Sequence, residues 1–311
     1  MQFRNQILGF YYLFYSSLPL RVKESLIKNI LLLTAPSYFV SELFYSLKFR
    51  RIRFDRKIFQ VDPEIGCQKV VMDKTLVGSC IVEANKLLSN YNSNKNLIEN
   101  TNLKQYLLNI GSLSNGGIKQ TDSIYKLFTN GAIINSVSDY LKFTPILYDI
   151  TVFYSPKKSS NLNSRFSGSQ LFHRDADDIT VSKIWLLCDD IDEDSGPTVL
   201  LPFNKSEQVA KEIGYRSGRK IESDSIFDRY SSDLIFLTGQ AGTAFVTDTV
   251  KCFHYGSRTS NEKGRLVIMA HFVTKYSDYV RPVLTFKRKV IERNVKLSKK
   301  TDLDKIILRS Y

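Results

Sequence analysis

SQLFHRDADD, the sequence of residues 169–178, contains one of only three histidines in this 311-residue chain. If the backbone here is extended, the side chains of His173 and Asp175 project to the same face, because successive side chains of a strand alternate. An imidazole and a carboxylate on one face supply two of the three ligands of the facial triad that holds non-haem Fe(II). The third ligand must come from a distant part of the chain, and His254, 81 residues later, is the candidate.

Short apolar runs separated by turns fill the chain from Pro145 onward, and they are typical of strands. The expected strands cover residues 147–154, 181–188, 198–201, 242–247, 251–255 and 264–273. Helices do not alternate with them, which argues against a doubly wound parallel sheet. Before Pro145 the spacing of apolar residues predicts helices over 1–60, 73–89 and 123–141, a strand over 68–71 and a surface connection over 90–117. The sequence therefore predicts an α+β chain whose second half is a sheet sandwich or jelly roll.

We expect three segments along the chain. A basic and aromatic helical extension covers residues 1–60, the β-rich domain covers 61–280, and a basic tail covers 281–311. Within the domain, residues 203–240 are highly charged and helical in character. They are predicted to be a lid-like insertion that selects the substrate.

The formal net charge of +13 favours anionic partners such as nucleic acid, anionic lipid, or a phosphorylated or CoA-linked substrate. No zinc-finger spacing or ribonucleoprotein-type aromatic signature is present, so a nucleic-acid partner is not expected. Residues 26–47 are apolar and are followed by six basic residues within 48–57. Residues 1–60 are therefore candidates for peripheral contact with a membrane; the alternatives are helices packed on their own domain and a lysine-rich solvated surface.

The cysteines indicate the compartment. Cys67, Cys80, Cys188 and Cys252 include no Cys-X-X-Cys pair, so a disulfide framework or a zinc site is not expected. Cys188 and Cys252 lie in apolar runs and are predicted to be small core residues. A reducing, cytoplasmic location follows from this pattern.

A candidate anion-binding residue follows the second histidine. Arg265 lies eleven residues beyond His254 and opens the strand expected over 264–273. A turn at 259–263 would pair the two strands antiparallel and bring the guanidinium near the metal, where it could bind a carboxylate through two hydrogen bonds. Arg258 is a rival for this role, but it lies in the expected turn.

The ordered set of His173-X-Asp175, His254 and Arg265, with KIWLLCDDIDEDSGPTVLLP at 183–202, resembles the Fe(II)- and 2-oxoglutarate-dependent dioxygenases. The resemblance is to their phytanoyl-CoA dioxygenase-like branch and covers about residues 123–275. It implies a double-stranded β-helix with supporting helices. It also implies Fe(II) held by the two histidines and the aspartate, with O₂ and 2-oxoglutarate as co-substrates. The far carboxylate of 2-oxoglutarate would pair with Arg265.

Several positions bear on how closely the chain follows that branch. Arg174 stands where many relatives have Gln, and Gly256 stands where a small hydroxyl residue is frequent, with Ser257 next to it. Gln170, Trp185 and Ser257 are further candidates for contact with 2-oxoglutarate or substrate, although Trp185 fits a core position as well.

Two further expectations concern residues near these motifs. His271 is about 20 Å along its strand from Arg265, at about 3.3 Å per residue, and is expected to be structural rather than a ligand. Asp177 and Asp178 are expected to form a solvated turn.

The resulting functional prediction is an Fe(II)- and 2-oxoglutarate-dependent dioxygenase. It would hydroxylate an aliphatic carbon of a small or carrier-linked substrate and release succinate and CO₂. The alternatives are a non-catalytic jelly-roll binding module and a membrane-surface protein.

Overall fold

The computed structural model describes residues 36–54, 56–93, 106–157, 165–216, 218–260, 262–277 and 301–309. Most of the predicted N-terminal extension, residues 1–35, and most of the predicted C-terminal tail lie outside the described residues.

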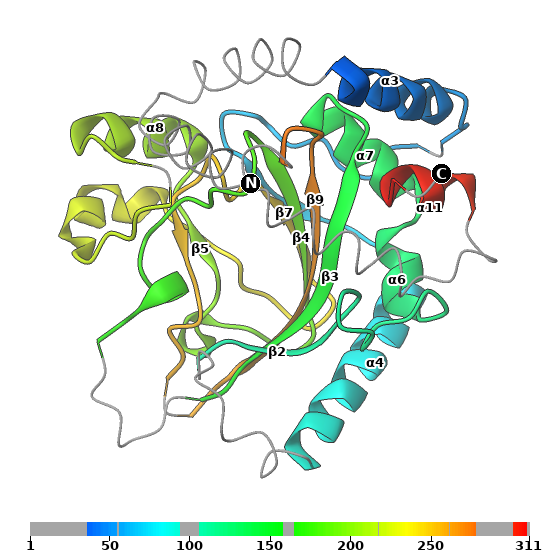
Figure 1. Ribbon diagram of the computed structural model, residues 1–311. Helices are drawn as coiled ribbons and strands as arrows, with labels where there is room; N and C mark the ends of the chain where they lie inside the picture. Colours follow the sequence, from blue (N-terminus) through cyan, green and yellow to red (C-terminus); the bar gives the residue numbers. More distant parts are fainter. Residues whose placement is uncertain are drawn as a thin grey trace, which may run out of the picture.

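The described strands form two antiparallel sheets (Figure 1). The large sheet has six strands in the order β1-β7-β4-β9-β3-β2, and the small sheet has three in the order β6-β5-β8. The large sheet comprises β1 (Cys67–Val70), β2 (Leu108–Ser112), β3 (Ile146–Ser155), β4 (Val181–Leu187), β7 (Ala244–Thr247) and β9 (Arg265–Val273). The small sheet comprises β5 (Val199–Leu200), β6 (Ile235–Phe236) and β8 (His254–Tyr255). The chain thus combines helices with antiparallel sheet, as predicted.

The central strands of the large sheet are apolar because both of their faces are covered. Every residue of β9 is buried. Leu266 and Ile268 contact the helical layer, whereas Val267 belongs to the cluster between the two sheets. A strand buried on both faces needs a continuous apolar run rather than an alternating one. This run made β9 recognisable in the sequence.

Helices cover the outer face of the large sheet (Figure 1). Within the described residues they are α4 (Lys74–Ser93), α6 (Ser123–Phe128), α7 (Gly131–Leu141) and α11 (Asp302–Ile307), with α3 (Pro36–Arg50) beside α11. The single helix predicted over 123–141 is in fact two. Asn130 leaves the helical conformation, and its side chain accepts a hydrogen bond from the backbone N–H of Ala132, which starts α7. No described helix is both long and apolar enough to cross a membrane.

The segment 203–240 packs on the outer face of the small sheet. It contains α8 (Phe203–Glu212) and the 3₁₀ helix η3 (Asp224–Asp233). A buried cluster joins these helices to the sheet: Phe172, Leu201, Val209, Ile221, Phe227, Tyr230 and Phe253. The role of this segment as a lid stays a prediction.

Two short strands were not predicted. β6 lies inside the segment 203–240, and β2 lies inside the connection predicted over 90–117. β2 is an edge strand with an irregular register between Asn109 and Gly111. β6 is only two residues long and lies in the apolar run 234–237 of an otherwise charged segment, whereas β2 is interrupted by Asn109 and Gly111, so both are defined mainly by their pairing partners.

Candidate metal centre and anion site

The two predicted histidine ligands face each other across an extension of the small sheet. His173 and His254 form an antiparallel bridge. The N–H of His173 donates to the carbonyl of His254 at 3.0 Å, and the reverse bond is 2.9 Å. The N–H of Asp175 then donates to the carbonyl of Thr249 at 2.9 Å. This pairing keeps residues 173–175 extended, so the side chains of His173 and Asp175 project to one face.

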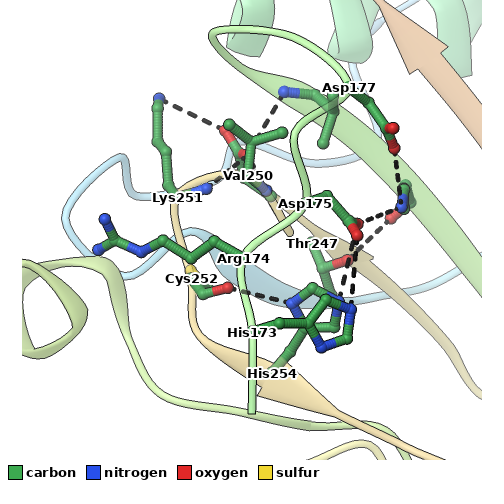
Figure 2. A network of polar contacts seen from close by, with 12 residues as sticks. His173, Arg174, Asp175, Asp177, Thr247, Val250, Lys251, Cys252 and His254 are labelled. Atoms are coloured by element: carbon green, nitrogen blue, oxygen red, sulfur yellow. Dashed lines mark hydrogen bonds and ion pairs between the residues drawn. The ribbon is translucent and has the colours of Figure 1, made fainter. Parts of the chain in front are cut away.

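The three side chains converge on one point (Figure 2). Their potential ligand atoms all lie within 4.8 Å of one another. His173 Nε2 is 3.6 Å from Asp175 Oδ1, and His254 Nε2 is 3.7 Å from Asp175 Oδ2. Two ligand atoms that are each about 2.1 Å from a metal lie about 3.0–4.2 Å apart for bond angles of 90–180°. With one oxygen of Asp175 as its ligand atom and all three ligand atoms within 4.8 Å of one another, the group fits a divalent ion after a small rearrangement.

Each imidazole is oriented by a hydrogen bond to its other nitrogen. His173 Nδ1 lies 2.8 Å from the carbonyl oxygen of Leu171, and His254 Nδ1 lies 3.1 Å from that of Cys252. A carbonyl accepts only, so each Nδ1 donates its proton to that carbonyl and each ring presents Nε2 toward the point of convergence. Burial and the neighbouring His173 lower the pKa of His254 to about 3, so this imidazole is neutral near pH 7. Both histidines are thus prepared to act as metal ligands through Nε2.

A buried lysine completes the charge balance of the site. Lys183, on β4, places Nζ 2.5 Å from Asp175 Oδ2 and 3.8 Å from Asp177 Oδ2. Burial alone would raise the pKa of Asp175, but Lys183 and the histidines hold it well below its usual range. The same contacts raise the pKa of Lys183 despite its burial. The carboxylate is therefore ionised, as a ligand must be. Sequence reasoning missed Lys183, although a charged residue inside an apolar strand was a usable signal.

Arg265 occupies a cradle of hydroxyl groups between the two sheets. In the described part of the chain its guanidinium donates to Thr198 Oγ1 at 3.1 Å, Ser257 Oγ at 3.0 Å and Ser155 Oγ at 3.4 Å. Arg265 is only 4% exposed, and burial lowers its pKa to about 10. No carboxylate forms an ion pair with it among the described residues. A buried cation without an anionic partner is costly, which points to a ligand that supplies one.

Counting donors gives the same conclusion. A guanidinium has five N–H groups in a planar fork. Three hydrogen bonds are formed to the hydroxyls, so two N–H groups remain for another acceptor. Two N–H groups are the number that a bidentate carboxylate needs. The cradle is thus suited to a carboxylate ligand.

Small residues shape this cradle. A Cβ at Gly256 would lie 3.0 Å from Arg265 Nη2 and 3.3 Å from Thr198 Oγ1, so glycine makes room for the guanidinium. Ser257 supplies the hydroxyl and adopts a positive φ of 61°. The hydroxyl that relatives of the resembled family carry two residues after the distal histidine is provided here one position later.

The other predicted contact residues are placed as follows. Gln170 donates through Nε2 to the carbonyl of Ser257 at 2.8 Å, so its side chain fixes the backbone beside the cradle. Trp185 is partly buried between the sheets and donates to Thr247 Oγ1 at 2.9 Å. Arg174 points away from the histidines (Figure 2) and pairs with Glu207 on α8 at 2.8 Å.

The predicted pairing of the strands that carry His254 and Arg265 was wrong. β8 pairs with β5 in the small sheet, whereas β9 pairs with β3 and β4 in the large one. Arg265 therefore reaches the site across the space between the sheets. Leu200 pairs with His254, so Thr198 lies two residues before that pair and Ser257 lies three residues after it. At about 3.3 Å per residue, both are about 7–10 Å along the strands from His254.

Three further residues near the motifs have defined places. Arg258, the rival arginine, forms an ion pair with Asp224 on η3, with distances of 2.5 and 3.1 Å, and is therefore neutralised. The solvated turn predicted at Asp177 and Asp178 was wrong, because both residues are buried. Asp178 accepts hydrogen bonds from the N–H and hydroxyl of Thr274, and these hold it inside the domain.

His271 lies near the far end of β9 and is not a member of the convergent group. Its ring packs edge-on against Tyr148, with centroids 4.9 Å apart.

No protein-family model matches the chain, and no curated protein matches it significantly. Solved structures that align with the chain include EctD from S. alaskensis with 2-oxoglutarate and 5-hydroxyectoine, with a TM-score of 0.46 and 12% identity over 72% of this chain and 85% of that one. The epimerase SnoN in complex with Fe³⁺, alpha ketoglutarate and nogalamycin RO has a TM-score of 0.44 and 13% identity over 68% and 80%. The non-heme monooxygenase ThoJ, in its apo form, has a TM-score of 0.42 and 12% identity over 80% and 98%. At this level of similarity, function depends on the residues of the site.

Proposed function

We propose that the chain is an Fe(II)- and 2-oxoglutarate-dependent oxygenase built on a double-stranded β-helix. The observation that carries the proposal is the pairing of two features in one interior. A His/Asp/His group fits a divalent ion, and a buried arginine with no acidic partner among the described residues reaches from β9 to the hydroxyl groups near the strand that carries His254. A metal site alone suits many reactions. Its combination with a carboxylate cradle suits a metal-chelating dicarboxylate such as 2-oxoglutarate.

His173, Asp175 and His254 would hold Fe(II) on one side and leave open positions opposite them. When bound, Fe(II) would supply the oxidising chemistry, in which 2-oxoglutarate and O₂ give succinate and CO₂ while one oxygen atom enters the substrate C–H bond as a hydroxyl. The role of Arg265 is to bind the far carboxylate and so fix the orientation of the oxo acid end. Thr198 and Ser257 keep the guanidinium itself in place.

Lys183 would determine how Asp175 binds the metal. Its ammonium occupies Asp175 Oδ2. A carboxylate with one oxygen held in this way offers the other oxygen as a single ligand atom, which keeps coordination positions open for the co-substrate. Lys183 thus acts through Asp175 as a positioning residue.

The interior supports an apolar substrate. Trp185 and Phe153 belong to the cluster between the sheets and keep part of their surface exposed. This agrees with hydroxylation of an aliphatic carbon in a small or carrier-linked molecule. Membership of the phytanoyl-CoA dioxygenase-like branch is part of the same proposal and is supported by the residue pattern from His173 to Arg265.

The test is turnover of 2-oxoglutarate by purified protein reconstituted with Fe(II). We expect slow succinate formation in air without added substrate, and its loss in His254→Ala. Arg174→Gln is the control, because Arg174 lies between the ligands in sequence but points away from them. A protein that binds no iron and produces no succinate would instead be a non-catalytic binding module.

A further inference from the structure

The second feature of interest is an apolar stripe on α3, far from the metal centre. Val40, Leu43, Phe44 and Leu47 recur at the helical spacing of i, i+3, i+4 and i+7, so they share one face. Their exposed fractions are 69%, 59%, 45% and 49%, in that order. Exposed apolar side chains are common singly, but a contiguous row on one helix face marks an interaction surface.

The opposite face of α3 is fixed to the domain. Glu42 is 4% exposed and forms a bidentate ion pair with Arg309, at 2.8 and 2.9 Å. Arg309 follows α11 and also lies over the ring of Tyr45, 4.7 Å from its centroid. Phe49, on the same side, is part of the main core. The stripe is therefore held outward by a rigid attachment, and Figure 1 shows α3 at the periphery of the molecule beside α11.

A cluster of positive charge continues the stripe. The basic residues at the end of α3 and just after it are Lys48, Arg50, Arg51, Arg53, Arg56 and Lys57. Arg50, the last residue of α3, lies three residues beyond Leu47 and so extends the line of the stripe, and Arg51 follows it in the turn after the helix. Lys57 pairs with Asp139 at 2.8 Å. Within the described residues, no ion pair neutralises the four arginines.

We propose that residues 40–57 form a docking surface for an anionic membrane. The stripe would enter the boundary between headgroups and acyl chains, and the arginines would contact anionic headgroups. Charge favours this occupant over a second copy of the chain, since anionic headgroups complement the arginines, whereas a second copy carries the same excess of positive charge on this surface. The inference is independent of the proposed oxygenase activity.

Co-sedimentation of the full chain with vesicles tests the proposal. Vesicles of phosphatidylcholine alone are compared with vesicles containing one-third phosphatidylserine, at low and high salt. We expect binding to the anionic vesicles that weakens with salt. Arg50→Gln/Arg51→Gln should lower the partition coefficient about 25-fold, at about five-fold per basic residue. Leu43→Gln/Leu47→Gln should lower it by a similar factor.

The matched control is Val82→Gln, which changes a 70% exposed valine on α4. It should bind as the wild type does. Unchanged melting temperatures would show that the α3 variants remain folded. The proposal is overturned if the α3 variants bind like the wild type, if neutral vesicles bind equally well, or if the stripe instead supports a dimer that Leu43→Gln/Leu47→Gln dissociates.

Discussion

Replacing Arg265 by methionine should have opposite consequences for folding and for ligand binding. The substitution keeps an unbranched side chain of similar length but removes the charge and all five N–H donors. Among the described residues, the buried guanidinium has only hydroxyl groups as partners. We therefore expect the fold to tolerate the loss of the charge, whereas binding of a dicarboxylate should not.

The effect on stability follows from two contributions. Burial lowers the pKa of Arg265 to about 10, so the folded protein holds the proton less tightly than the unfolded chain does, which costs about 3 kcal/mol at any pH well below 10. Replacing Arg265 by methionine removes the buried charge and should therefore stabilise the fold by about 3 kcal/mol. The three lost hydrogen bonds, at about 1 kcal/mol each, cancel it. The melting temperature of Arg265→Met should therefore stay within a few degrees of the wild type.

The effect on binding has no such compensation. Truncating one partner of a buried, hydrogen-bonded charge pair costs about 2–5 kcal/mol, which weakens binding about 30-fold to several thousand-fold. Calorimetric titration of 2-oxoglutarate with Mn(II) in place of Fe(II) measures this directly, because no turnover consumes the ligand. Arg258→Met is the control, since Arg258 is already neutralised by Asp224.

Two results would refute this reasoning. One is an unchanged affinity of Arg265→Met for 2-oxoglutarate, which would remove the carboxylate from the cradle. The other is a loss of affinity in Arg258→Met that equals the loss in Arg265→Met, which would assign the anion to the wrong arginine.

Other substitutions give equally direct outcomes. Asp175→Ala should destabilise the fold by about 3–5 kcal/mol in urea unfolding, because the buried ammonium of Lys183 loses its main partner, and Asp175→Ala/Lys183→Met should recover most of this. Lys183→Met should tighten Mn(II) binding roughly ten-fold, measured from the resonance signal of free Mn(II), because a competing cation leaves Asp175; weaker binding would contradict this. Gly256→Ala should weaken 2-oxoglutarate binding but not metal binding, since its Cβ would crowd Arg265 Nη2 at 3.0 Å. Arg309→Met should lower stability by about 3–5 kcal/mol, and Glu42→Gln/Arg309→Met should restore much of it; equal stability of both variants would mean that the buried pair is not what matters.

The spacing of apolar residues predicted the helices and strands that are well buried, because buried elements consist largely of apolar residues. β9 contains the continuous apolar run 266–270 and β4 is apolar over 184–187, because helices cover one face and the small sheet covers the other. β6 has only the apolar run 234–237 within a charged segment and β2 is interrupted by Asn109 and Gly111, so each is defined mainly by its pairing with a neighbouring strand. The helix predicted over 123–141 is interrupted at Asn130, which caps the start of α7. The spacing of apolar residues does not reveal such a cap.

The residues of the site also divide into those that the sequence pattern indicates and those that it does not. The His-X-Asp spacing follows from the alternation of one extended segment, so it is readable in sequence. Arg265 comes close to the site because the two sheets pack against each other, which the sequence does not reveal. The assumption of a local hairpin therefore gave the wrong strand pairing. Ser155 and Thr198 come from separate strands and carry no sequence signal as hydroxyl partners of an arginine. Lys183 was missed because its strand was recognised from the apolar residues alone and its one charged residue was not used.

The central claim is that one interior binds Fe(II) and 2-oxoglutarate together. Its most direct test is anaerobic addition of both to the purified chain, followed by visible absorption spectroscopy for the charge-transfer band of the chelated complex. We predict a band that requires both additions, saturates at one Fe(II) per chain, disappears in His254→Ala, and needs far more 2-oxoglutarate in Arg265→Met. Absence of the band in the wild type, or its persistence in His254→Ala, would contradict the account.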